Sequence, residues 1–344
     1  MPLRLLEVVL PVDQVAAVDA MFLEKPVVNI WYDQISEQQI LLKILAQADE
    51  TEHLMDLLVK KFGHEAWFRL VLLPVAASLP RVEEPEAEVA VVGEQDKEKK
   101  KPERISREEL YTNIQEMARQ SRGYLGMVIL STVVAAVGLL NDNVAVIIGA
   151  MVIAPLLGPI IAQAMATTLG DFDLARLALK TNLIGLSLAL LLSIFLGLLL
   201  PVNPYGPEIA ARTNIGLGDI AVALASGGAG ALAFTAGAST VLVGVMVAVA
   251  LMPPLAALGL LLGSGFLFPA FGAALLLVTN IICVNLAAVM VFWLQGIRPT
   301  TWWEEKKAHR ATIISIGACL GLLAVLTTAI LLSQYLRGRV FYFL

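Results

Sequence analysis

The sequence predicts an α-helical polytopic membrane protein with about seven transmembrane helices and a small N-terminal α+β domain of ferredoxin-like type. Composition predicts the membrane part, because 58% of the 344 residues are hydrophobic and 15% are charged. Soluble domains average about 45–50% apolar and about 25% charged residues. Charge predicts the division between the N-terminal domain and the membrane part. Residues 1–122 hold 22 acidic and 15 basic residues, whereas residues 123–344 hold 7 acidic and 9 basic residues. An acidic, hydrophilic third therefore precedes an apolar two-thirds.

The N-terminal domain is predicted over residues 1–79 from short apolar runs that alternate between strand and helix periodicity. Their order, β-α-β-β-α-β, is typical of a ferredoxin-like sandwich. The predicted elements are strand 4–10, helix 13–24, strand 27–32, strand 40–45, helix 50–62 and strand 67–73, which ends before Pro74. His53 and His64 lack the spacing of metal ligands and are predicted to be surface residues.

Two segments connect this domain to the membrane. Residues 80–104 are acidic and then lysine-rich, a composition that predicts a flexible linker. Residues 105–122 are predicted to form an amphipathic helix that starts at Ser106 with Glu109 in capping-box spacing. We expect this helix to lie at the membrane surface or to run straight into the first span.

Seven apolar stretches are long enough to cross about 30 Å of hydrocarbon. They are 123–140, 144–169, 178–200, 219–236, 239–262, 269–294 and 311–334. Residues 201–218 are then an extracytoplasmic loop, and residues 295–344 are a cytoplasmic loop followed by the last span.

Basic residues predict the orientation of the spans. They gather before the first span, between the second and third at Arg176 and Lys180, and between the sixth and seventh at 298–310. Because cytoplasmic loops carry the excess of Lys and Arg, we expect a cytoplasmic N-terminal domain and an external C-terminus in the inner (plasma) membrane. The start of the chain has no secretory cleavage pattern, in agreement with this orientation.

The sequence also predicts an internal repeat. Shifting it by 95 positions places residues 146–159 (VIIGAMVIAPLLGP) on residues 241–254 (VLVGVMVAVALMPP), and a shift of 98 places Thr181 and Asn182 on Thr279 and Asn280. Two three-helix copies are therefore predicted, over residues 123–200 and 219–294. Because each copy has an odd number of crossings, the second copy must be inverted relative to the first, as in many secondary transporters.

Paired prolines predict that one helix of each copy is broken. Proline removes a backbone donor, so Pro155, Pro159, Pro253 and Pro254 would free carbonyl groups inside the apolar stretches. Such groups are tolerated in a membrane where protein, water or an ion satisfies them. The alternative is that these prolines serve packing alone.

Few other residues in the sequence could bind a ligand or take part in a reaction. Asn182 and Asn280 either join helices or face an aqueous cavity. No ionisable residue lies deep in a predicted span, which disfavours a carboxylate proton relay. No catalytic, phosphate-binding or dinucleotide-binding motif is present. We therefore expect no enzyme activity, no cofactor, no metal and no nucleic-acid partner.

The stretches NDNVAVIIGAMVIAPLLGPI (141–160), GD (170–171) and VGVMVAVALMPPLAALG (243–259) resemble the prokaryotic membrane family called domain of unknown function 389, the uncharacterised hydrophobic domain. The likeness covers about residues 120–295, and ISREELY before it fits the same pattern. The resemblance implies an integral membrane protein of a bacterium or archaeon, and it implies no catalytic residues.

The leading hypothesis is a transporter for a small solute or ion bound between two proline-broken helices in the lipid bilayer. An ion channel is one alternative, and a membrane signalling or scaffold protein with a cytoplasmic sensor domain is another. Gly317 and Gly321 form a Gly-x-x-x-Gly motif, and a homo-oligomer is expected. The predicted substrate-binding residues are Met151, Pro155, Pro159, Asn182, Val249, Pro253, Pro254 and Asn280.

Overall fold

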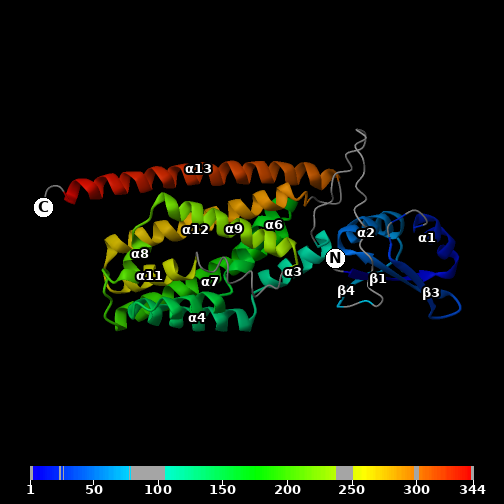
Figure 1. The fold of residues 1–344 in the computed structure, drawn as a ribbon, viewed down its shortest axis with the longest axis horizontal. Helices are drawn as coiled ribbons and strands as arrows, with labels where there is room; N and C mark the ends of the chain where they lie inside the picture. The colour runs from blue at the N-terminus through cyan, green and yellow to red at the C-terminus, as the bar shows by residue number, and fades with distance from the viewer. Residues whose placement is uncertain are drawn as a thin grey trace, which may run out of the picture. The chain divides into compact units, whose positions relative to one another are not determined.

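The computed structural model describes residues 3–22, 25, 27–76, 78, 105–237, 251–297 and 302–341. The chain divides into two compact units, Met1–Leu110 and Tyr111–Leu344 (Figure 1). The first contains a small antiparallel sheet and the second is helical, as the charge division predicts. The predicted linker, residues 80–104, lies outside the described residues.

The first unit is a four-stranded antiparallel sheet with helices on one face. Its strand order is β2-β3-β1-β4, and neighbouring strands are antiparallel. Side chains from one face of the sheet form the core with those of α1 and α2, among them Leu6, Ile44, Val18 and Leu58. The elements are β1 (Leu3–Pro11), the 3-10 helix η1 (Val12–Gln14), α1 (Val15–Phe22), β2 (Asn29–Gln34), β3 (Gln39–Gln47), α2 (Ala48–Phe62) and β4 (Leu70–Val75).

The element order is the predicted one, but the end of the last strand is not. Pro74 lies inside β4, where it pairs with Arg4. A strand at the edge of a sheet has one free hydrogen-bonding side and accommodates a proline there. Because β4 is an edge strand, the prediction that it ends before Pro74 is wrong. His53 and His64 are exposed, as predicted.

The predicted juxtamembrane helix is α3, Arg107–Ala118. The Ser106 hydroxyl accepts a hydrogen bond from the Glu109 amide at 3.3 Å, which satisfies one free donor of the first turn. The Glu109 carboxylate binds Arg4 instead of completing a capping box, with its two oxygens 2.8 and 2.9 Å from the guanidinium nitrogens. The helix does not continue into the first span, because it ends at Ala118 and a new helix begins at Arg122.

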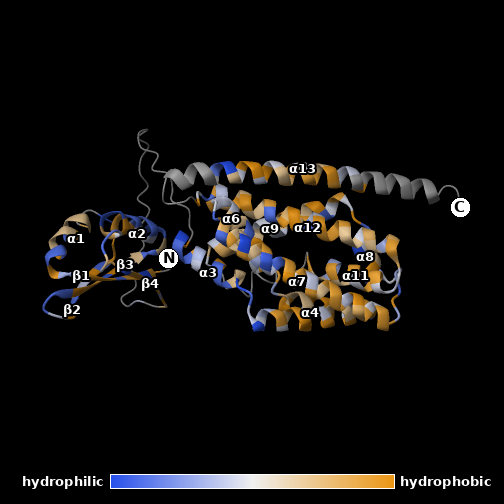
Figure 2. Ribbon diagram, turned by 180° about the vertical axis from the view of Figure 1, so that it is seen from behind, coloured by the Kyte–Doolittle hydropathy of each residue, from blue (hydrophilic) through white to orange (hydrophobic). Residues whose placement is uncertain are grey.

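The second unit is a bundle of helices on which apolar residues predominate (Figure 2). Among the described residues, five helices are long and apolar enough to cross a membrane, or six if one bent pair counts as a span. The five lie in α4, α7, α9, α12 and α13, and the bent pair is α5 with α6. The elements are α4 (Arg122–Leu140), α5 (Val144–Ile153), α6 (Leu157–Leu169), α7 (Phe172–Leu199), α8 (Pro207–Thr213), α9 (Leu217–Thr235), α11 (Met252–Gly263), α12 (Leu267–Leu294) and α13 (Trp302–Phe341).

The structure differs from the predicted spans and loops in two places. The third predicted span begins at 178, but α7 begins at Phe172 and carries Arg176 and Lys180, both exposed, in its first turns. The loop predicted over 201–218 contains the short helix α8. Charged residues near a helix end remain accessible to water, so the hydropathy of the sequence places these ends too far inward. The predicted span 239–262 is described from residue 251 onward.

Small residues bring α7 and α11 into backbone contact. A Cβ atom added at Gly197 would collide with the Leu260 carbonyl, and one added at Gly263 would collide with the Ile194 carbonyl. Close approach through glycine is a common way for membrane helices to pack, because apolar side chains gain little by leaving lipid. All residues from Met252 to Leu261 are buried, so α11 lies inside this unit.

The longest helix, α13, packs against α12 and α6 (Figure 1). The Thr312 hydroxyl lies 3.4 Å from the Thr167 carbonyl, and Asn285 lies 3.9 Å from the Cys319 sulfur. Within residues 309–328 much of its apolar surface is nevertheless uncovered, for example at Ile314, which is 69% exposed. An apolar surface of this size is compatible with lipid rather than water as its solvent.

Candidate cavity at the break between α5 and α6

The α5–α6 pair is one apolar stretch interrupted by three residues, and its two helices are bent by 52°. Pro155 lies in the interruption and has no amide hydrogen with which to continue the ladder of α5. The residue before a proline is driven out of the helical region. Ala154 accordingly has φ −66° and ψ 118°, an extended conformation, so proline explains the break locally.

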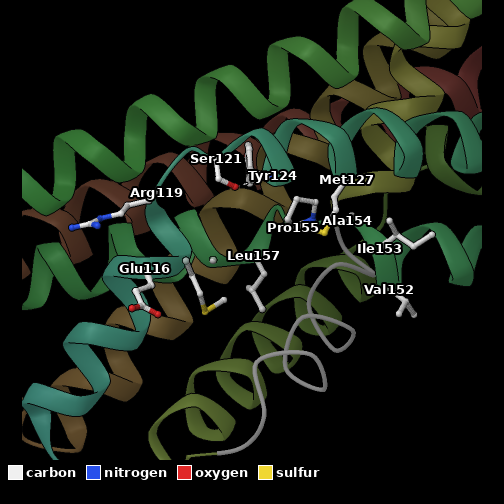
Figure 3. Close-up of a pocket in the computed structure, with 12 residues that line it drawn as sticks. Glu116, Arg119, Ser121, Tyr124, Met127, Val152, Ile153, Ala154, Pro155 and Leu157 are labelled. Atoms are coloured by element: carbon white, nitrogen blue, oxygen red, sulfur yellow. Dashed lines mark hydrogen bonds between the residues drawn. The ribbon is translucent and has the colours of Figure 1, made fainter.

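A cavity of about 310 Å³ lies beside this break (Figure 3). Three segments form its wall: the end of α3, the start of α4 and the turn from α5 into α6. In Figure 3, Glu116 and Arg119 are drawn on one side and Pro155 with Met127 on the other. The lining residues are Glu116, Met117, Arg119, Ser121, Tyr124, Met127, Val152, Ile153, Ala154, Pro155, Leu157 and Gly158.

The wall combines apolar side chains with a few polar groups. Glu116 and Arg119 are exposed and supply both signs of charge, whereas Met127 and Leu157 supply apolar surface. Two helices begin at the wall, α4 after Ser121 and α6 at Leu157, and helix N-termini present unpaired amides to their surroundings. Mostly apolar concave sites with few polar groups are the usual form of small-molecule sites.

Hydrogen bonds hold the wall in place. The Thr181 hydroxyl of α7 donates to the Ala118 carbonyl at 2.8 Å and so satisfies one of the carbonyls left free where α3 ends. The Tyr124 hydroxyl of α4 donates to the Thr181 carbonyl at 3.2 Å. Gly185 leaves space for that hydroxyl, because a Cβ at this position would collide with it. These contacts fix the ends of α3 and α4 against α7.

Outside the apolar stretches, Tyr111 of α3 is tied to the turn between α6 and α7. Its hydroxyl donates to the Asp171 carboxylate at 2.7 Å. The other oxygen of Asp171 accepts the amides of Asp173 and Leu174, each at 3.0 Å, and so caps α7. Burial and the nearby carboxylate raise the pKa of Tyr111 to about 12. One carboxylate therefore joins α3 to the start of α7.

Of the predicted binding residues, Pro155 lines the cavity, and the other described ones do not. Met151 is buried in the last turn of α5. Pro159 is buried as the third residue of α6, where an amide hydrogen has no partner within the helix. The break therefore lies at Pro155, and Pro159 is compatible with the helix that follows.

The second proline pair lies at the start of a helix. Pro253 and Pro254 are buried in the first turn of α11, as Pro159 is in the first turn of α6. Val249 and the rest of residues 238–250 lie outside the described residues.

The two asparagines lie on different helices. Asn182 is half-buried in α7, and Asn280 is buried in α12 with 6% of its surface exposed. The Thr279 hydroxyl bonds the Leu275 carbonyl of its own helix at 2.8 Å, whereas Thr181 bonds another helix. The paired Thr-Asn motifs thus have different contacts.

The cavity residues from α3 and α4 are absent from the predicted set. Glu116 and Arg119 look like ordinary solvated charges, and Tyr124 looks like an interfacial aromatic. One signal in the sequence could have revealed the break between α3 and α4. Ser121 is a capping residue there, and it accepts the Tyr124 amide at 3.0 Å. Within the described residues, no group of three or more His, Cys, Asp or Glu is placed to hold a metal ion.

Comparison with known proteins identifies relatives but no activity. The family model described as domain of unknown function (DUF389) matches residues 151–286. A protein of Methanocaldococcus jannaschii, named as uncharacterized, is 38% identical over 275 residues, which cover 80% of this chain and 82% of the relative. No solved structure matches the chain.

Proposed function

The chain belongs to the DUF389 family of proteins, and from that premise we propose that it is a membrane transporter whose small solute or ion binds beside the break between α5 and α6. The observation that carries the proposal is the coincidence of an interrupted span and a cavity, both at Pro155. In a membrane, irregular backbone is tolerated where it is buried in protein or lines a cavity. A break that also lines a cavity therefore points to binding.

The spacing of the helices supports the proposed repeat. The 19-residue α4 begins at Arg122 and the 19-residue α9 begins at Leu217, 95 residues later. The 28-residue α7 begins at Phe172 and the 28-residue α12 begins at Leu267, again 95 residues later. The shift that aligns the sequences thus aligns helix starts and helix lengths as well. Two copies of one three-helix unit are the simplest reason for this agreement.

The packing between helices supports the same repeat. Each copy has a short buried helix, α6 in the first and α11 in the second, and a long one, α7 or α12. The helix α6 packs against both α7 and α12, and α11 packs against both α12 and α7. Each short helix thus packs against the long helix of its own copy and against that of the other copy. A pseudo-two-fold axis between inverted copies produces such a pattern.

In the proposed topology the chain crosses the inner membrane seven times, with the N-terminal unit in the cytoplasm and the C-terminus outside. The basic residues before α4, near the start of α7 and before the last span support this orientation. The fifth predicted span, residues 239–262, includes α11 except its last residue, and residues 238–250 lie outside the described residues. The N-terminal unit would regulate or assemble the membrane part.

The composition of the cavity wall restricts the mechanism. Its charged residues, Glu116 and Arg119, belong to the end of α3 and the following turn, and the wall deeper in the membrane unit is neutral. A solute would therefore be held by apolar contacts, helix-end amides and carbonyls rather than by a buried carboxylate. Flux should accordingly follow the gradient of the solute or of an accompanying ion, with no requirement for a titrating residue inside a span.

The test is a flux assay with the full-length chain in sealed proteoliposomes. Radiolabelled or fluorescent ions, amino acids and organic acids are offered in turn, with protein-free vesicles as the control. Saturable uptake driven by a gradient is the expected result. Single-channel conductance would indicate a channel instead, and absence of flux across the panel, with the helical circular dichroism of the protein preserved, would favour a signalling or scaffold role.

Asn280→Leu tests whether the buried asparagine of α12 takes part. We expect flux to be lost if Asn280 contacts the solute, because its amide is buried in a neutral helix. Flux at the level of the unsubstituted chain would remove Asn280 from the site without affecting the role of the cavity at Pro155.

A further inference from the structure

The sheet of the N-terminal unit is apolar on both faces, although α1 and α2 cover one of them. The strands β1 and β3 contain the runs RLLEVVL and ILLKILA, without the alternation of apolar and polar residues that marks a sheet with one solvated face. On the uncovered face Leu5 pairs with Leu45 on one side and with Leu73 on the other. A face of this composition is normally covered by another surface.

Exposure confirms that the described residues leave much of this face open. Trp31 and Val71 are each 42% exposed, and Leu73 is 39% exposed. A groove of about 440 Å³ lies on the same face, lined by Leu5, Trp31, Asp33, Lys43, Leu45, Val75 and Ser78. The open face therefore combines protruding apolar side chains at its edges with a hollow between them, and both features suit interdigitation with a second surface.

Charges across the middle of the face indicate what that surface is. Lys43 forms an ion pair with Asp33 on β2 and lies opposite Glu7 on β1. The hydrogen bond that the Lys43 ammonium donates to the Asp33 carboxylate raises the pKa of Lys43. With a two-fold axis between β1 and β3, Lys43 of each copy lies across from Glu7 of the other copy, so the row is self-complementary. The interior of a lipid layer offers no such partners.

We propose that this open face is the interface at which two copies of the N-terminal unit pack sheet against sheet. The apolar side chains around Leu5 and Leu73 would form its centre, and the row of Glu7, Lys43 and Asp33 would set the register between the copies. Packed sheets are separated by ~10 Å, a distance that side chains such as Trp31 and Leu73 can fill from both sides. The membrane part then belongs to a dimer whatever its own contacts are.

The test measures the distance between spin labels in the full-length protein, after Cys283 and Cys319 have been replaced by alanine. Val71→Cys places a label on the open face, and Val59→Cys places a matched label on the outer side of α2, where Val59 is 46% exposed. In the proposed dimer β4 of one copy lies over β2 of the other, so the Val71 labels are separated by ~10 Å across the sheets and by ~15 Å along them. The Val59 labels are further apart, because a helix layer ~10 Å thick is added on each side.

A second pair of variants tests the interface itself. Leu73→Glu places an acid in the apolar centre and should abolish the short distance at Val71. Val59→Glu adds the same charge at similar exposure and should leave that distance unchanged. Lys43→Glu leaves three acids in the row, so it should weaken the short distance.

The proposal fails if the Val71 labels are no closer than the Val59 labels, or if neither pair shows dipolar coupling. It also fails if Leu73→Glu leaves the short distance in place. A label at Val71 that is immobilised without a nearby second label would mean that another part of the same chain covers the face, and that result too would overturn the dimer.

Discussion

Proline has two roles in the described part of the membrane unit. In the first, Pro155 joins two helices bent by 52° and lines a cavity. In the second, Pro253 and Pro254 begin α11, of which every residue from Met252 to Leu261 is buried. A proline in the first turn of a helix costs no hydrogen bond, whereas one after the last turn ends the helix. The same residue type therefore gives an opening in one place and a tightly packed core in the other.

The largest effect should follow from adding volume to the packed segment. Gly259→Ala in α11 would place a Cβ against the Ser193 side chain of α7, so we expect a destabilisation of about 1–3 kcal/mol. Gly149→Ala in α5 is the matched control, because no atom lies within 4 Å of the new Cβ. Alanine there should stabilise the helix by up to about 1 kcal/mol. Unfolding in detergent, followed by circular dichroism, measures both, and equal effects would contradict the contrast between the segments.

A smaller effect should distinguish the two threonines that the repeat pairs. Thr181→Val removes a hydrogen bond to another helix, at the Ala118 carbonyl, and should destabilise the unit by about 0.6–1.7 kcal/mol. Thr279→Val removes a hydrogen bond within α12, where the Leu275 carbonyl remains in the helical ladder. We therefore expect a destabilisation several times smaller than that of Thr181→Val. The same unfolding assay applies. A larger loss for Thr279→Val would show that the wall of the cavity does not depend on Thr181.

The smallest effect is a pH dependence at the Tyr111–Asp171 hydrogen bond. The folded chain raises the pKa of Tyr111 from 10.0 to about 12, through burial first and Asp171 second. A raised pKa means that the folded state favours the protonated phenol. The stabilisation is therefore complete below about pH 10 and is lost as the pH rises toward 12. Tyrosinate absorbance is measured during titrations of the native chain and of Tyr111→Phe, and the difference between them is the titration of Tyr111. A Tyr111 that titrates at about pH 10 would contradict the prediction.

The sequence predicted most of the helices because each membrane span needs a long apolar run. The observed α4, α9 and α12 agree with the predicted 123–140, 219–236 and 269–294 to within two residues at each end. The β-α-β-β-α-β order was also readable, because short apolar runs alternate with helical periodicity. The position of Pro155 as a break followed directly from the chemistry of proline.

The cavity could not be predicted, because it depends on contacts between distant segments. Its wall needs α3 to end at Ala118, and that end is held by Thr181, which lies in another helix. Glu116 and Arg119 become wall residues through this tertiary contact alone. Nor did hydropathy reveal α8, a polar helix too short to give a span signal. Local patterns predict elements, whereas cavities arise where elements meet.

The measurement that tests the central claim most directly is the flux of two matched tryptophan variants in proteoliposomes. Met127 lines the cavity and is 44% exposed, whereas Met290 of α12 is 45% exposed and does not line it. Met127→Trp should fill part of the cavity and reduce uptake strongly, while Met290→Trp should transport like the unsubstituted chain. If both variants transport equally, with equal stability in detergent, the cavity beside Pro155 is not the binding site of the solute.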